Sequence, residues 1–201
     1  MPSWDFERAA ADKGFCAVCG CDEAGVGPLA GRVYAGAVIL PEGLELSGLN
    51  DSKQVTEKRR EELYDQITAQ ADAWAVAWVE PQEIDEIDIL NSRIKAMQLA
   101  VDALGKRADF ALIDGNRDHG SRCAITAPHQ LIVKGDSLSM SIAAASILAK
   151  VSRDRYMREM AARYPQYEFE RHKGYPTKRH YALLRELGPC PIHRRSFLKK
   201  L

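Results

Sequence analysis

Five short apolar segments, set between long stretches of helical periodicity, constrain this fold more than any other feature of the sequence. The apolar segments occupy residues 15–23, 32–41, 72–80, 109–115 and 129–136. Runs of this length, bounded by glycine, proline or charged residues, are typical of buried strands. The pattern predicts an α/β fold with a mixed sheet covered by helices, in which the first two strands form a hairpin-like pair.

The helical stretches have recognisable ends. Helices are expected over residues 57–67, 84–104, 138–164 and 180–187. Thr56 is placed to cap the first of these helices, and Pro165 is placed to end the third. Small residues at 143–146 would let the third helix pack closely on the sheet.

Charge is unevenly distributed along a chain whose formal net charge is +0. Residues 1–150 carry 15 Lys and Arg against 23 Asp and Glu, whereas residues 151–201 carry 13 against 5. An acidic body with a basic end suits a polyanionic partner, although a solvated basic helix gives the same counts. We therefore expect a core over residues 1–150 and a basic helical C-terminal module over residues 151–201, continuous with the core.

Other features narrow the class of protein. No apolar run reaches the roughly 18 residues of a membrane span, and the N-terminal stretch lacks the apolar centre of a secretory signal. A cytoplasmic protein is therefore expected, and the odd number of cysteines, five, indicates reduced thiols. Cys16 and Cys19 form a CxxC pair, but no second pair follows at the spacing of a zinc site, so a buried strand is the better interpretation.

Four carboxylates stand at the ends of predicted strands. Asp22 and Glu23 close the first strand, Asp114 closes the fourth, and Asp136 follows the fifth. Active sites of open α/β sheets lie outside strand carboxyl ends, and acids that meet there repel one another unless cations lie between them. Oxygen ligands suit Mg²⁺ or Mn²⁺, and two such ions about 4 Å apart stabilise both reacting oxygens of a phosphoryl displacement. Taken singly, each acid is better explained as a solvated loop residue, but the four together at strand ends are not.

A geometric condition applies to the first two acids. Adjacent residues of a regular strand face opposite sides, so Asp22 and Glu23 can share a site only if the pleat breaks near them. Gly25, Gly27 and Pro28 follow directly and favour such a break.

Five segments together resemble the ribonuclease HII family. They are CGCDEAGVGPLAG (19–31), LNDSKQVTEKRREELY (49–64), LIDGN (112–116), LIVKGDSLSMSIAAASILAKVSRD (131–154) and HKGYPTKRHYALLRELGPCPIHRRSF (172–197). They follow the family's order and span nearly the whole chain. The resemblance implies a ribonuclease H-like catalytic core with a mixed five-stranded sheet, flanking helices and a basic helical C-terminal extension.

The resemblance also implies an activity. The expected enzyme is a metal-dependent endoribonuclease that uses Mg²⁺ or Mn²⁺ by a two-metal mechanism, and a monomer is expected. Its expected substrates are the RNA strand of RNA–DNA hybrids and duplex DNA with an embedded ribonucleotide, which is cut on the 5′ side to leave 3′-hydroxyl and 5′-phosphate ends. The family's four acids match Asp22, Glu23, Asp114 and Asp136, the residues that the strand ends select.

Other positions carry over as substrate contacts. Tyr175 matches the tyrosine that family members place against the deoxyribose after the ribonucleotide, where an aromatic face can test for a missing hydroxyl. Phosphate contacts are expected from polar side chains on loops, namely Ser52, Lys53, Lys134, His172 and Lys173. Without the resemblance, each of these would be an ordinary solvated or turn residue.

The loop Gly25–Val26–Gly27 departs from the family pattern, which has arginine between the glycines. Family members use this loop to approach the 2′-hydroxyl near the scissile bond. The glycines still allow close backbone approach, but Val26 offers no donor. Arg32 occupies a position where proline is usual and is a candidate for a replacement cation.

Two other functions compete with this one. A two-metal nuclease acting on plain DNA is disfavoured by the Gly25–Gly27 loop and Tyr175 as hydroxyl sensors. A non-catalytic hybrid-binding protein is disfavoured by the four intact acids, although Val26 leaves room for it. Cleavage of all-DNA and ribonucleotide-containing duplexes, with and without Mg²⁺, distinguishes the three.

Overall fold

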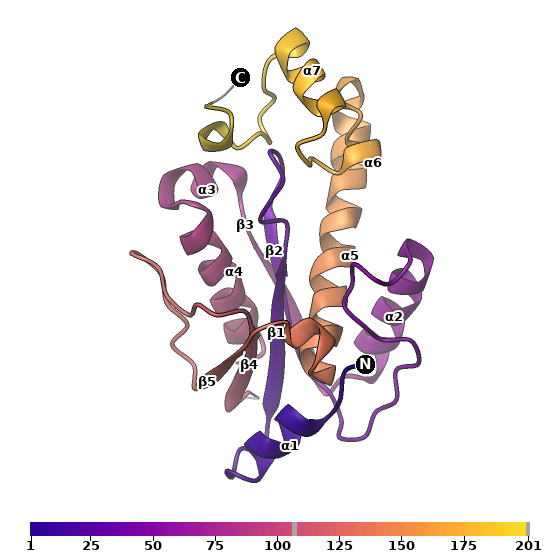
Figure 1. Ribbon diagram of the computed structural model, residues 1–201, viewed down its shortest axis with the longest axis vertical. Helices are drawn as coiled ribbons and strands as arrows, with labels where there is room; N and C mark the ends of the chain where they lie inside the picture. Colours follow the sequence, from indigo (N-terminus) through magenta and orange to yellow (C-terminus); the bar gives the residue numbers. More distant parts are fainter. Residues whose placement is uncertain (106–107, 200–201) are drawn as a thin grey trace.

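The computed structural model describes residues 1–105 and 108–199 (Figure 1). Its strands are β1 Val18–Ala24, β2 Val33–Ile39, β3 Ala73–Val79, β4 Phe110–Asp114 and β5 His129–Ile132. They form one sheet in the order β3-β2-β1-β4-β5. β2 is antiparallel to both β1 and β3, whereas β4 is parallel to β1 and β5. The predicted mixed five-stranded sheet and the β1–β2 pair are confirmed.

Helices cover both faces of the sheet. They are α1 Asp5–Ala11, α2 Glu57–Gln70, α3 Pro81–Ile87, α4 Ile89–Ala103, α5 Met140–Arg163, α6 Phe169–His172 and α7 Lys178–Leu187. α4 packs on one face, and α5 and α2 pack on the other (Figure 1). α6, α7 and the segment after them lie at one end of the molecule, next to the turn between β1 and β2 (Figure 1).

Helix α5 lies very close to the sheet. A Cβ on Gly20 would be 2.1 Å from the Ser141 carbonyl carbon, and a Cβ on Gly36 would be 2.6 Å from the Ala145 carbonyl oxygen. Neither strand position has room for a side chain where α5 crosses it. The predicted close packing of the small residues of this helix is confirmed.

The predicted helix over residues 84–104 is wrong in one respect, because two helices meet at Asp88. This residue has a φ of 68°, and its carboxylate accepts a hydrogen bond from the Asn91 N–H at 2.9 Å. A capping aspartate with a positive φ ends α3 and starts α4. The apolar spacing continues on both sides of Asp88 and hides the break.

The other predicted helices form, with shifted ends. Thr56 caps α2 by accepting a hydrogen bond from the Arg59 N–H, and α5 ends before Pro165. α1 and α6 were not predicted, and β5 is shorter than predicted because Lys134, with a φ of 59°, turns the chain. The division at residue 150 falls within α5 and stays a prediction. None of the described helices is both long and apolar enough to cross a membrane.

Candidate active site

Three of the predicted acids meet where β1 runs past the end of β4. Asp22, Glu23 and Asp114 each offer a carboxylate oxygen, and these oxygens lie within 4.8 Å of one another. We call these three residues the acid cluster. Within residues 1–105 and 108–199, no other group of three or more His, Cys, Asp or Glu residues is arranged to hold a metal ion. Cys16 and Cys19 therefore do not contribute to such a site.

The expectation that Asp22 and Glu23 can share a site only if the pleat breaks near them is wrong. β1 stays paired with β2 through Ala24, and the chain turns only at Gly25, where φ is 98°. The pairing of β1 with β4, however, ends at Cys21. On that side Asp22 and Glu23 have no neighbouring strand, and this open edge lets both carboxylates approach the end of β4.

Asp136 stands beside the acid cluster. It lies in the short 3₁₀ helix Gly135–Ser137 and is 8% exposed. The Gly135 N–H donates a hydrogen bond to Asp114 Oδ1 at 2.7 Å, which ties this turn to the cluster. Burial raises the pKa of Asp136, and the charges of Asp51 and Asp114 raise it further. Asp51, which sequence reasoning did not select, therefore belongs to the same acidic surface.

The cluster has the properties of a cation site. Burial raises the pKa of Asp22 well above its usual value, and the charges of Glu23 and Asp114 add to this effect. Among the described residues, Glu23 Oε2 is buried and has no hydrogen-bond partner. Crowded carboxylates with an unsatisfied buried oxygen and no nitrogen or sulfur ligand fit a divalent cation of the Mg²⁺ or Mn²⁺ type.

An arginine that sequence reasoning missed also contacts the cluster. Arg93 on α4 forms an ion pair with Glu23, with Nε 2.8 Å from Oε1, and its Nη2 donates to the Asp114 carbonyl at 3.1 Å. The sequence gives no signal for this contact, because α4 reaches the end of β4 only through the tertiary fold.

A buried arginine organises the Gly25–Gly27 loop. Arg194, with no exposed surface, donates hydrogen bonds to five carbonyl groups, those of Gly25, Val26, Pro28, Gly31 and Arg32. One guanidinium group therefore fixes the whole turn between β1 and β2 from the C-terminal module. Sequence reasoning assigned Arg194 no role, because a single arginine near a chain end is usually solvated.

The structure places Tyr175 next to this loop. A Cβ on Gly27 would lie 3.8 Å from Tyr175 Cε1, and the tyrosine is 41% exposed. The buried Arg153 guanidinium lies 5.5 Å from the Tyr175 ring centroid and donates to the Lys173 carbonyl at 2.9 Å. The glycine loop and the exposed ring thus form one continuous surface, held from behind by α5.

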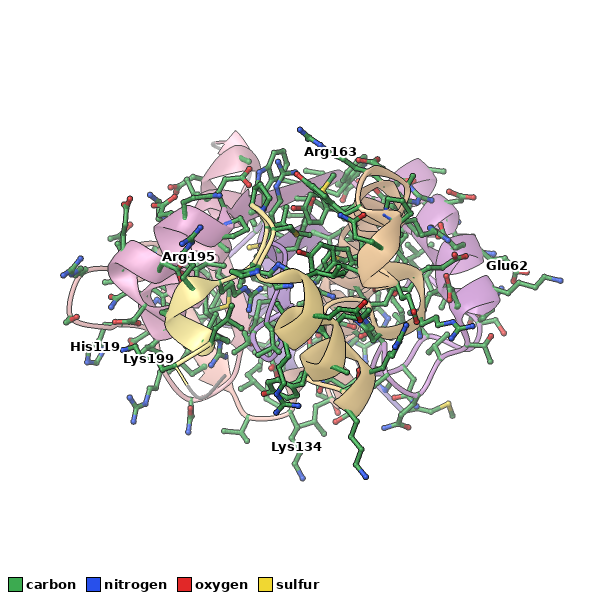
Figure 2. All side chains as sticks on the ribbon, turned by 90° about the horizontal axis from the view of Figure 1, so that it is seen from above. Glu62, His119, Lys134, Arg163, Arg195 and Lys199 are labelled. Atoms are coloured by element: carbon green, nitrogen blue, oxygen red, sulfur yellow. The ribbon has the colours of Figure 1, made fainter. Side chains whose placement is uncertain are left out.

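The residues expected to contact phosphates are placed in different ways. Lys53 is close to the acids, with Nζ 3.8 Å from Asp136 Oδ2, and neighbouring Ser52 is buried. Lys134 is exposed and projects from the molecule in Figure 2. His172 is buried, and its ring nitrogens contact the Tyr167 carbonyl and the Gly174 N–H, so neither is available for a phosphate.

Arg32, the candidate replacement for the arginine missing at position 26, is engaged by other side chains. Its Nη2 forms a 2.7 Å ion pair with Glu80, and its guanidinium lies 4.9 and 4.6 Å from the ring centroids of Trp78 and Tyr156. Its Nη1 also donates to the Tyr34 hydroxyl. These contacts hold the Arg32 side chain against groups of β2, β3 and α5.

Three buried histidines support the turn that carries Tyr175. The His172 and His180 rings stack at 4.2 Å, and His180 Nε2 lies 3.0 Å from His193 Nε2. His180 Nδ1 donates to the Tyr175 carbonyl, so its Nε2 accepts from His193, whose Nδ1 accepts from the Cys190 N–H. These hydrogen bonds hold His180 and His193 neutral, each in one tautomer.

We expect this histidine cluster to make the C-terminal module sensitive to acid. Burial lowers the pKa of both His180 and His193 to about 4, below the usual 6.5. Because the unfolded chain takes up these protons first, the free energy of unfolding should fall as the pH drops from 6.5 towards 4. Thermal melts across this range should show a smaller decrease for His193→Gln than for the wild type. His119→Gln, which replaces an exposed histidine, is the control. A dependence of the melting temperature on pH that is the same in His193→Gln as in the wild type would contradict the prediction.

Comparison with known proteins bears on the family and the fold. The family model for ribonuclease HII matches residues 19–200. The ribonuclease HII of Ruminiclostridium cellulolyticum is 48% identical over 194 residues, which are 96% of this chain and 74% of that protein.

Solved structures support the fold. The ribonuclease H2 of Pyrococcus horikoshii OT3 has a TM-score of 0.74 and 27% identity, covering 90% of this chain and 93% of that one. Bst-RNase HIII, solved in complex with Mn²⁺, has a TM-score of 0.59 and 18% identity, covering 85% and 70%, and this likeness concerns the fold alone. The family match over residues 19–200 and the identity to its members show that this chain belongs to the ribonuclease HII family.

Proposed function

We propose that this protein is a metal-dependent endoribonuclease that cuts the RNA strand of RNA–DNA hybrids. We further propose that it incises duplex DNA on the 5′ side of an embedded ribonucleotide, leaving 3′-hydroxyl and 5′-phosphate ends. The observation that carries the proposal is the acid cluster of Asp22, Glu23 and Asp114. The Gly25–Gly27 loop follows directly after Glu23, and Gly27 lies beside Tyr175.

In this proposal the acids act as metal ligands. Asp22, Glu23, Asp114 and the adjacent Asp136 would hold two divalent cations, Mg²⁺ or Mn²⁺, and the Mn²⁺ complex of Bst-RNase HIII gives a precedent within the fold. Such cations supply charge neutralisation at the phosphate and lower the pKa of an attacking water.

The chain's other groups would position the substrate. The backbone of Gly25 and Gly27 would approach the 2′-hydroxyl, and the Tyr175 ring would lie against the following deoxyribose, where a 2′-hydroxyl would not fit well. Arg194 fixes the loop through its carbonyl groups, so the loop is organised before the substrate binds. Lys53, whose Nζ lies near Asp136, would contact a phosphate of the substrate.

Cleavage of a duplex with one ribonucleotide tests the proposal. Mg²⁺-dependent cutting at the 5′ side of the ribonucleotide, with 3′-hydroxyl and 5′-phosphate ends, is the expected result. An all-DNA duplex of the same sequence is the control. Equal cleavage of the control would indicate a plain DNA nuclease, and binding without turnover would indicate a non-catalytic protein.

The basic C-terminal module should contribute salt-dependent binding. Neutralising Lys173, Lys178 and Arg179 together should raise the Michaelis constant and reduce the steepness of its salt dependence. Each lost phosphate contact changes the log–log slope by about 0.9. Arg179 is paired with Glu168. We therefore expect the triple variant to lose about two phosphate contacts rather than three, and the slope to change accordingly.

Arg163→Ala is a control for the loss of one basic side chain. Arg163 lies on the opposite side of the molecule from Lys134 in Figure 2. Its replacement should leave the salt slope unchanged. The same slope in the triple variant and the wild type would show that the duplex lies elsewhere.

A further inference from the structure

Arg93 places a fixed positive charge against the acid cluster. Its side chain is 17% exposed and that of Glu23 is 13% exposed, so the ion pair between them is largely shielded from water. The same guanidinium donates to the carbonyl of Asp114. Arg93 therefore contacts two of the three residues of the cluster.

The fold provides a specific place for this guanidinium. Gly115, directly after Asp114, has a φ of 112°, and a Cβ there would lie 2.3 Å from Arg93 Nη2. A side chain at position 115 would force the end of the Arg93 side chain to shift. The end of β4 is thus shaped to accept Arg93 from α4.

The other acids have their own supports. Asp22 Oδ1 accepts a hydrogen bond from the Glu23 N–H at 2.7 Å, and Asp114 Oδ1 accepts one from Gly135. The Glu23 backbone is paired with Ala35 in the sheet. Backbone groups therefore confine the carboxylates of Asp22 and Asp114, whereas the Glu23 carboxylate pairs with Arg93, so Arg93 contributes both position and charge to the cluster.

Charge at this position acts on the apo site and on a bound cation in opposite ways. Arginine stays protonated in proteins, so it compensates one of the three carboxylates when no metal is bound. The same positive charge repels a divalent cation that approaches the free Oε2 of Glu23.

We propose that Arg93 is a built-in counter-cation of the metal site, which stabilises the apo cluster and weakens its affinity for divalent metal. This inference rests on the proposed metal-dependent function. Arg93 is thus a positioning residue that acts through Glu23. Its charge helps to determine the metal concentration at which the site fills.

Calorimetric titration of Mn²⁺ into the full chain without substrate tests the proposal. Arg93→Met has a similar length without the charge, and it should bind Mn²⁺ about tenfold more tightly than the wild type, a change of about 1.4 kcal/mol. Arg93→Lys keeps the charge and should stay within about twofold. Arg93→Gln, which retains a donor for the Asp114 carbonyl, should shift in the same direction as Arg93→Met.

Thermal melts give a second readout. In chelator, Arg93→Met should melt below the wild type because Glu23 loses its partner, and Mn²⁺ should raise its melting temperature by more than it raises that of the wild type. A purely structural role for Arg93 would not produce tighter metal binding. Equal or weaker Mn²⁺ binding by both neutral variants would overturn the inference, whereas a wild type that binds no Mn²⁺ would overturn the proposed metal site itself.

Discussion

Asp114→Asn is expected to slow cleavage by at least about a thousandfold while the protein stays folded. The substitution removes a charge and a ligand oxygen from the acid cluster, where Asp114 lies within 4.8 Å of the carboxylates of Asp22 and Glu23. A thousandfold loss corresponds to about 4 kcal/mol of the activation barrier, within the range expected when charge stabilisation by a metal is lost. Asparagine keeps an acceptor for the Gly135 N–H, so the turn that carries Asp136 should survive.

Single-turnover cleavage and thermal melts together check this expectation. In chelator, the melting temperature of Asp114→Asn should equal or exceed that of the wild type, because repulsion within the cluster is relieved. Asp65→Asn, an exposed acid on α2, is the control for removal of one negative charge. A folded Asp114→Asn with near-normal turnover would exclude Asp114 as a metal ligand.

Asp136→Asn tests the residue that stands beside the cluster. We expect it also to lose most activity, because its carboxylate is largely buried and faces the same acidic surface. Near-normal turnover by this variant would remove Asp136 from the site and leave a cluster of three acids.

Val26→Arg is expected to raise activity on a single-ribonucleotide duplex by about tenfold or more. An arginine in this loop could donate charge-assisted hydrogen bonds to a phosphate or sugar oxygen, each worth roughly 1.5–3 kcal/mol when well formed. A tenfold gain needs only about 1.4 kcal/mol. The carbonyl of Val26 is already held by Arg194, so the loop backbone should keep its conformation in the variant.

The structure strengthens this prediction by removing one source of compensation. Arg32, the candidate replacement cation, is engaged by Glu80 and by the Trp78 and Tyr156 rings. Steady-state kinetics of Val26→Arg on a single-ribonucleotide duplex and on a long RNA–DNA hybrid should show the larger gain on the first substrate. Val26→Met controls for side-chain length without charge, and no gain on either substrate would mean that another group already fills this role.

Sequence reasoning succeeded where local patterns carry the information. The strand lengths predicted the five strands, the small residues predicted the close contact of α5, and Thr56 marked the start of α2. It failed at Asp88, where a polar cap interrupts an apolar pattern that is otherwise continuous. It also missed α1 and α6, which are short and carry little periodic signal.

Some residues of the candidate site could be selected from the sequence, and others could not. The strand ends selected Asp22, Glu23, Asp114 and Asp136 because strand direction decides where side chains gather, and that direction follows from the order of the elements. Arg93, Arg153 and Arg194 were not selected, because the sequence does not show which arginines become buried. Each of them contacts residues more than 20 positions away in the chain.

The sequence by itself determined the family, the sheet and the acids, because strand periodicity, helix caps and short motifs are encoded by neighbouring residues. Only the tertiary structure decided how these parts act on one another. It closed the acid cluster at the open edge beyond Cys21, placed Tyr175 beside Gly27 and paired the Arg32 side chain with Glu80. These outcomes depend on close packing between distant segments, and the charge and burial of each group are settled only when those segments meet.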